Sequence, residues 1–193
     1  MGLFFVNYNT VYSLYMTKRK KIIFFDGDGT LWYPKSTRWS RKPHWIYEGS
    51  PKPKEYLRLL IVTPGILKIL KQLKKDGLLL IALSTHPHPK KEADWHLQQK
   101  IHHFKLDVLF DYIYTARPRP EGKGLIMKKV LRKMKIPKSQ AVLIGDNYVY
   151  DYLSAKKVGV ECVLLHTPYL EIPKGRTAKK LIKSWEELVA TIE

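Results

Sequence analysis

The chain has 193 residues, a length typical of one domain and sufficient to bury a hydrophobic core. Lys and Arg outnumber Asp and Glu by 35 to 17, and the formal net charge of +18 attracts anions such as phosphorylated molecules or nucleic acid. The single cysteine, Cys162, excludes an internal disulfide, and no apolar run is long enough to span a bilayer, so we expect a cytoplasmic protein without a membrane partner.

Residues 1–20 precede the regular pattern and form an N-terminal extension. The first fifteen residues are apolar and aromatic, without the basic segment and cleavage site of a signal peptide. Met16, followed by Thr-Lys-Arg-Lys-Lys, is an alternative start of translation. The purpose of residues 1–15 and the oligomeric state stay open.

Five short and nearly continuous apolar runs predict strands that are buried on both faces, as in a parallel sheet. They are residues 21–25, 78–83, 112–115, 141–144 and 161–165. Helical patterns occupy residues 63–77, with Thr63 as the expected N-cap, then 89–103, 123–134 and 151–157, and the segment that begins at Ser184. This alternation predicts an α/β fold with a Rossmann-like, doubly wound parallel sheet, in one domain over residues 1–193.

The stretch from Tyr33 to Tyr56 interrupts this alternation. It contains four prolines and the tryptophans Trp39 and Trp45 among basic residues, so it cannot form one regular element. Because it follows the first strand directly, we expect residues 33–58 to form a flap over the site at the carboxyl end of that strand. The tryptophans either stack on a ligand or anchor the flap on the core.

Acidic residues follow the first and the fourth predicted strands. Asp26 and Asp28 come directly after residues 21–25, and Asp146 and Asp151 follow residues 141–144. Two carboxylates about 4 Å apart repel by roughly 4 kcal/mol at an effective dielectric constant of about 20, so such a cluster requires a cation. Oxygen ligands favour Mg²⁺ over zinc.

A hydroxyl and an ammonium group complete a candidate phosphate site. Ser84 ends the second strand, where its hydroxyl can donate to a phosphoryl oxygen, and Lys123 opens the helix after the third strand, where it can neutralise negative charge. Thr85 is either structural or a further phosphate contact. Simpler roles as helix caps remain open for Ser84 and Asp151.

Five histidines gather at positions 86, 88, 96, 102 and 103. Without cysteine or acid partners at ligand spacing, we interpret them as solvated side chains. His86, two residues after Ser84, is a candidate contact to a substrate.

The four segments resemble, in order and spacing, the four motifs of the haloacid dehalogenase (HAD) phosphatase superfamily. Asp26 to Thr30 is similar to the first motif, Ser84 to the second, Lys123 to the third, and Gly145 through Asp151 to the fourth. The resemblance covers residues 21–166. The short gap between the first two motifs leaves no room for a large cap domain, and the chain looks like the capless magnesium-dependent phosphatases of HAD subfamily III. Its second motif departs from the pattern, with Ser-Thr-His where relatives often have Ser-Arg-Thr.

The resemblance implies a Mg²⁺-dependent phosphomonoester hydrolase with two catalytic aspartates. Asp26 would attack phosphorus and form an aspartyl-phosphate. Asp28 would protonate the leaving oxygen and then activate water.

The remaining motif residues would hold the metal and the phosphate. Mg²⁺ would bind the Asp26 carboxylate, the Asp28 backbone carbonyl and Asp146, with Asp151 as a direct or water-mediated ligand. Ser84, Thr85 and Lys123 would hold the transferring phosphoryl group.

Three functions follow from this pattern. The first is hydrolysis of a phosphorylated small molecule or phosphoprotein. The second is a nucleic-acid 3′-end phosphatase, favoured by the basic flap, by Arg117 and Arg119, and by the net charge. The third, a phospho-receiver or binding module without catalysis, is disfavoured because receivers do not normally place a second Asp two residues after the acceptor.

Overall fold

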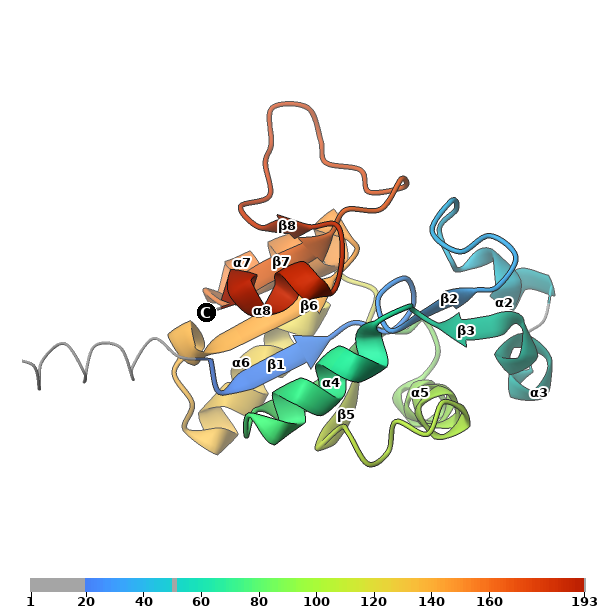
Figure 1. Ribbon diagram of the computed structural model, residues 1–193, viewed down its shortest axis with the longest axis horizontal. Helices are drawn as coiled ribbons and strands as arrows, with labels where there is room; N and C mark the ends of the chain where they lie inside the picture. The colour runs from blue at the N-terminus through green and yellow to red at the C-terminus, as the bar shows by residue number, and fades with distance from the viewer. Residues whose placement is uncertain (1–19, 50–51, 193) are drawn as a thin grey trace, which may run out of the picture.

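The computed structural model describes residues 20–49 and 52–192 (Figure 1). The expectations for the N-terminal extension, including the alternative start at Met16, fall almost entirely outside these residues. Within the described part of the chain, none of the helices has both the length and the apolar character needed to cross a membrane.

Six parallel strands form the central sheet in the order β5-β4-β1-β6-β7-β8. They are β1 (Ile22–Phe25), β4 (Leu79–Thr85), β5 (Tyr112–Ala116), β6 (Ala141–Gly145), β7 (Glu161–Leu165) and β8 (Leu181–Ile182). The predicted doubly wound parallel sheet is confirmed, and each of the five predicted strands matches an observed one. Strand β8 was missed because two residues are too short to show an apolar pattern.

Helices cover both faces of the sheet, and Figure 1 shows α4 in front of it and α6 behind it. The apolar residues of α4 (Ile66–Lys75), α5 (Lys90–His103) and α8 (Glu186–Ile192) belong to one core cluster. Those of α6 (Gly122–Met134) and α7 (Ser154–Val158) belong to a second cluster. Strand β1 sends Ile23 and Phe25 into the first cluster and Ile22 and Phe24 into the second, which explains its continuous apolar run.

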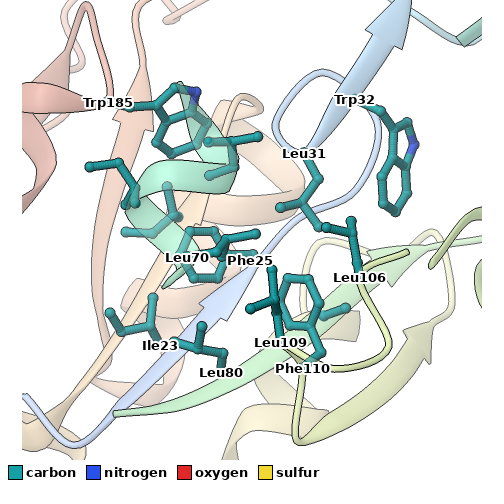
Figure 2. Close-up of a cluster of buried hydrophobic side chains, with 14 of the residues drawn as sticks. Ile23, Phe25, Leu31, Trp32, Leu70, Leu80, Leu106, Leu109, Phe110 and Trp185 are labelled. Carbon is teal, nitrogen blue, oxygen red and sulfur yellow. The ribbon is translucent and has the colours of Figure 1, made fainter. Parts of the chain in front are cut away.

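Phe25 lies at the centre of the first cluster, between Leu70 and Phe110 in the close-up (Figure 2). The centroid of its ring is 6.1 Å from that of Phe110 and 6.4 Å from that of Trp185. Asp26 follows directly, and its backbone N–H donates to the Ile144 carbonyl oxygen at 2.9 Å. Dense packing and this hydrogen bond fix the point at which the chain leaves the sheet.

The insertion after β1 is more regular than predicted. Two short antiparallel strands, β2 (Trp32–Pro34) and β3 (Leu60–Val62), form its base. Between them lie the short helices α2 (Trp45–Gly49) and α3 (Pro53–Tyr56) and the 3₁₀ turn η1 (Leu57–Leu59). Neither strand was predicted from the sequence, because each has only three residues and β2 ends in a proline.

The two tryptophans of the insertion hold it to the rest of the molecule. The Trp39 indole N–H donates to the Gly29 carbonyl oxygen at 2.8 Å, and both Trp39 and Trp45 pack partly buried against the first core cluster. Of the two alternatives left open by the sequence, the structure supports anchoring.

The expected N-cap at Thr63 is wrong. Helix α4 begins at Ile66 after Gly65, which has a φ of 87°. The Thr63 hydroxyl instead donates to the Thr30 carbonyl oxygen at 2.8 Å. Thr63 therefore ties the end of the insertion to the loop that follows β1.

Two further segments complete the chain path near the sheet edge. The 3₁₀ turn η2 (Lys138–Gln140) leads into β6, and the π-helical segment η3 (Tyr148–Leu153) follows it. The side chain of Asn147 caps η3 by accepting from the N–H groups of Val149 and Tyr150, both at 2.9 Å. Asp151 thus lies inside this segment and does not cap it.

Candidate active site

Three aspartates converge where β1 and β6 end side by side. One carboxylate oxygen from each of Asp26, Asp146 and Asp151 lies within 4.8 Å of the others, and all three side chains are buried. The carboxyl ends of neighbouring parallel strands meet at the same sheet edge, which is why residues more than a hundred positions apart come together.

Lys123 lies between two of these aspartates. Its Nζ is 2.5 Å from Asp26 Oδ1 and 2.5 Å from Asp151 Oδ1, and its side chain is fully buried. Burial favours the neutral amine, but the two carboxylates outweigh burial and raise the pKa of Lys123. Three carboxylates against one ammonium leave two negative charges uncompensated in this cluster.

The pKa values of two of the acids reflect this excess of negative charge. Burial, followed by the charges of Asp26 and Asp151, raises the pKa of Asp146 well above its ordinary value, although a hydrogen bond from Tyr169 at 2.6 Å opposes the shift. Burial also raises the pKa of Asp151 to about 6, against the effect of Lys123. A divalent cation would supply the missing positive charge, and a set of oxygen donors fits Mg²⁺.

Two glycines allow the backbone to approach these carboxylates. Gly29 has a φ of +87°, and a Cβ at this position would lie 2.0 Å from Asp146 Oδ2. A Cβ on Gly145 would lie 2.3 Å from Asp151 Oδ2. Any larger residue at either position would displace a carboxylate of the cluster.

Asp28 faces a different set of partners. Its Oδ1 accepts hydrogen bonds from the Trp32 indole N–H at 2.8 Å and from the Tyr47 hydroxyl, and Lys100 Nζ lies 3.0 Å from its Oδ2. Burial would raise the pKa of Asp28, but Lys100, His44 and the Tyr47 hydrogen bond together lower it to about 2. Asp28 is therefore ionised in the free protein.

Lys100 is held in an aromatic pocket as well as by this ion pair. Its Nζ is 4.4 Å from the ring centroid of Tyr47, 5.6 Å from that of Tyr56 and 5.8 Å from that of Trp32. Such cation–π contacts stabilise an ammonium group that has left water.

A cavity of about 340 Å³ is lined by the aspartate cluster, by Lys123 and by Asp28. Its wall includes Lys42, Pro43 and His44 of the insertion. On another side it includes Glu171 of the loop after β7, and Lys42 Nζ is 2.9 Å from Glu171 Oε1. The insertion therefore forms part of the wall of the cavity into which the aspartates point.

The structure brings the seven candidate catalytic, phosphate-binding and metal-binding residues to this one cavity, whereas His86 lines a neighbouring cavity. The seven are Asp26, Asp28, Ser84, Thr85, Lys123, Asp146 and Asp151. Ser84 is buried and Thr85 partly exposed. The Asp28 carboxylate is directed to Lys100 and stays outside the cluster of three, which is compatible with its backbone carbonyl serving as the ligand.

Four residues that contact the site were missed. Trp32, Tyr47 and Lys100 hold Asp28, and Tyr169 donates to Asp146. For Lys100 a signal existed, because Ala93, Leu97 and Ile101 recur every four residues and mark the buried face of α5 next to it. Trp32 and Tyr47 lie in the short elements β2 and α2, and Tyr169 lies in the loop after β7, so none of them belongs to a segment long enough to show such a periodicity.

The interpretation of the histidines needs a correction. His102 and His103 are exposed as expected, but His96 is only 7% exposed, and its Nδ1 lies 2.7 Å from the Tyr56 hydroxyl. Glu92 is an acid partner to two of the histidines, within salt-bridge distance of both His88 and His96. Glu92 lies four residues from each of them along the chain, so the expectation that these histidines have no acid partner is wrong.

Two curated relatives match part of the chain. It is 31% identical over 107 residues to the haloacid dehalogenase-like hydrolase domain-containing protein 3 of Xenopus laevis, covering 54% of this chain and 41% of that protein. It is 35% identical over 112 residues to the phosphoglycolate phosphatase of Pseudomonas fluorescens (strain Pf0-1), covering 58% and 39%. The matches thus span about two fifths of the length of these relatives.

A solved structure shares the fold over most of the chain. The predicted phosphoglycolate phosphatase from Haemophilus somnus 129pt superposes with a TM-score of 0.66 and 18% identity, over 90% of this chain and 98% of that one. The assignment to HAD subfamily III stays a prediction. Residues 35–165, more than half of the sequence, match the family model of haloacid dehalogenase-like hydrolases, and the chain belongs to this family.

Proposed function

We propose that the chain is a Mg²⁺-dependent phosphomonoester phosphatase that works through an aspartyl-phosphate on Asp26. The buried cluster of Asp26, Asp146 and Asp151 around Lys123 is the observation that carries this proposal. Its two uncompensated negative charges suit a divalent cation, and Lys123 suits the phosphoryl group that such a cation would help to bind.

Mg²⁺ would be held by the carboxylates of Asp26 and Asp146 and by the backbone carbonyl of Asp28, with Asp151 as a direct or water-mediated ligand. When bound, the ion neutralises negative charge on the phosphoryl oxygens and on the carboxylates. Ser84, Thr85 and Lys123 would orient the phosphoryl group.

In the first half of the reaction, a carboxylate oxygen of Asp26 attacks phosphorus and the ester P–O bond breaks. Asp28 donates a proton to the leaving oxygen. Because the pKa of Asp28 is held at about 2 in the free protein, it must first take up this proton. The negative charge of a bound phosphoryl group favours that uptake, since it raises the pKa of a nearby carboxyl.

In the second half, ionised Asp28 accepts a proton from water while the water oxygen attacks phosphorus. The bond between phosphorus and Asp26 breaks, which releases inorganic phosphate and the free carboxylate. Lys100 and Tyr47 stabilise the ionised form of Asp28 that this step requires.

We propose that the substrate is a small phosphorylated molecule. The chain would form a single domain, with residues 33–58 as a flap over the site. The name of the Pseudomonas relative is that of a small-molecule phosphatase. The cavity of about 340 Å³ is bordered by the insertion and by the Lys42–Glu171 ion pair, a shape suited to a compact ligand. A phosphoprotein is a further candidate substrate. The cytoplasmic location of the protein stays a prediction.

Activity assays on the full chain test this function. With Mg²⁺ we expect hydrolysis of p-nitrophenyl phosphate or of members of a sugar-phosphate panel, loss of activity in EDTA and recovery with Mg²⁺. A 3′-phosphorylated oligonucleotide in the same panel tests the nucleic-acid alternative, which predicts preference for the oligonucleotide and a steep decline with salt. Activity that persists in chelator would contradict the metal assignment, and hydrolysis of no phosphomonoester would favour a binding module.

Asp26→Asn tests the covalent step. Because the amide is a poor nucleophile, we expect kcat to fall by at least about 10³-fold, with an unchanged circular dichroism spectrum. Asp107→Asn, at an exposed position, is the matched control and should retain activity. Normal turnover of the Asp26 variant would rule out an aspartyl-phosphate.

A further inference from the structure

Three potential metal ligands, two on α5 and one in the segment just before it, lie together outside the aspartate cluster. His88, Glu92 and His96 recur at every fourth position, and one ligand atom from each lies within 4.8 Å of the other two. Glu92 Oε1 is 2.9 Å from His88 Nδ1 and 3.7 Å from His96 Nε2. A spacing of four residues places Glu92 and His96 on the same face of α5. His88 lies two residues before the helix, where the chain brings its ring next to Glu92.

His96 is oriented for coordination by a second residue. Its ring is buried, and Nδ1 lies 2.7 Å from the Tyr56 hydroxyl, whose side chain is 1% exposed. A histidine that binds a metal through Nε2 carries its hydrogen on Nδ1 and donates it to an oxygen such as this one. The Tyr56 contact therefore leaves Nε2, the nitrogen nearer to Glu92, as the ligand atom.

Small side-chain rotations would bring the three donor atoms to coordination distance from one ion. With metal–ligand bonds of about 2.0–2.2 Å, the donor atoms of a tetrahedral site lie about 3.3 Å apart. The buried His96 can stay in place, because the side chains of His88 and Glu92 are 44% and 47% exposed and free to rotate. The separations of up to 4.8 Å are within reach of such rotations.

The charges also permit a cation. Two neutral imidazoles and one carboxylate carry a single negative charge, which a divalent ion would more than neutralise. The nearby ammonium of Lys100 acts on His96, but it is paired with Asp28 at 3.0 Å. The repulsion of an incoming ion by Lys100 is reduced accordingly.

We propose that His88, Glu92 and His96 form a second metal site, for a transition ion of the Zn²⁺ type. Imidazole nitrogens favour such ions over Mg²⁺, so this site differs in selectivity from the all-oxygen aspartate cluster. Three protein ligands leave a fourth position open, as in sites where the metal binds water or substrate.

The fourth position has a place for its ligand. His88 and His96 line a cavity of about 220 Å³ whose wall also includes Asp28, His44 and Tyr47. The open position would face this cavity, whose wall also includes Asp28, the residue that we propose to act on the leaving oxygen. A bound ion would therefore offer a contact to an oxygen of the leaving group.

Co²⁺ spectroscopy on the untagged full chain tests the site. The metal-stripped protein is saturated with Mg²⁺, so that the aspartate cluster is occupied, and then titrated with Co²⁺. We expect one equivalent to bind with the intense visible d–d absorption of tetrahedral coordination, which Zn²⁺ abolishes by displacement.

Variants separate this site from other binding. Glu92→Gln, at an exposed position, should weaken Co²⁺ binding by more than about 100-fold, and Tyr56→Phe by about 10–100-fold, since second-shell changes have that size. His102→Ala and His103→Ala, exposed on the same helix, should bind as the unaltered chain does, and Asp146→Asn should keep the signal. The proposal is overturned if Co²⁺ gives no tetrahedral absorption, if Glu92→Gln binds normally, or if Asp146→Asn abolishes the signal.

Discussion

Two buried lysines flank the loop of Asp26 and Asp28, and their surroundings differ. Lys123, in the first turn of α6, lies between Asp26 and Asp151 at the end of the sheet. Lys100, in the last turn of α5, pairs with Asp28 and lies against aromatic rings. Both residues are 1% exposed, so burial does not distinguish them, but the number of carboxylates around each does.

The different number of carboxylates around the two lysines explains how one loop can present two aspartates with separate roles. The Lys123 side has two more carboxylates than ammonium groups, so it is suited to gain a cation and a phosphoryl group. The Lys100 side pairs one carboxylate with one ammonium group, and its charge is balanced without an ion. Asp26 is thereby suited to bind and attack, and Asp28 to exchange a proton.

The largest effect that would test this comparison is expected for Lys123→Met. Methionine keeps the length of the side chain but removes the charge, so we expect kcat to fall by about 10³-fold. The metal-free fold should lose about 3 kcal/mol, because the variant leaves buried carboxylates without their partner. Steady-state kinetics and urea unfolding measure the two effects.

The effect of Mg²⁺ on the stability of Lys123→Met gives a second test of the role of Lys123. Because the ion supplies positive charge to the same carboxylates, it should raise the midpoint of unfolding more in Lys123→Met than in the unaltered chain. Lys128→Met, exposed on the same helix, is the control. Equal stabilisation of the variant and the unaltered chain by Mg²⁺ would mean that Lys123 and the ion do not act on the same charges.

A smaller effect, about 10²-fold on kcat, is expected for Lys100→Met, since positioned acid–base groups contribute about 10²–10⁴-fold. Lys100 is the strongest of the groups that lower the pKa of Asp28, so the variant should raise this pKa above about 2. Dephosphorylation needs ionised Asp28, and the acid limb of its pH–rate profile should therefore move to higher pH. Single-turnover kinetics over a pH series measures that limb.

Lys91→Met, exposed on the same helix, is the control for Lys100→Met. A uniform loss of activity without a shift of the acid limb would show that Lys100 only supports the fold. Lys100 would then not control the protonation of Asp28, and the proposed difference in role between the two lysines would be wrong.

The Lys123 side of the site could be predicted from the sequence because its residues depend on the sheet alone. Asp26 and Asp146 follow continuous apolar runs, and Lys123 opens the helix after another run. Parallel strands bring their carboxyl ends to one edge whatever the details of packing. The order of residues along the chain therefore contained most of this geometry.

The Lys100 side could not be predicted in the same way. The spacing of Ala93, Leu97 and Ile101 identifies the buried face of α5, but no local pattern reveals that Lys100 meets Asp28 across 72 positions. That contact depends on how the insertion places Tyr47 and Tyr56 around the ammonium group. These residues belong to the short helices α2 and α3, which are too short to show a periodic pattern in the sequence.

The smallest effect is expected for Tyr169→Phe, which changes the Lys123 side without removing a charge. The Tyr169 hydroxyl donates to Asp146 Oδ2 at 2.6 Å and favours the ionised carboxylate, against the burial that raises the pKa of Asp146. Without it, the Mg²⁺ concentration for half-maximal activity should rise by about 10-fold, the lower end of second-shell effects on metal affinity. At saturating Mg²⁺ the ion itself holds Asp146 ionised, so kcat should stay close to that of the unaltered chain.

Tyr112→Phe, exposed on β5, is the matched control. A fall in kcat with no change in the Mg²⁺ requirement would place Tyr169 in substrate binding instead, and the aspartate cluster would then owe its metal affinity to its own carboxylates.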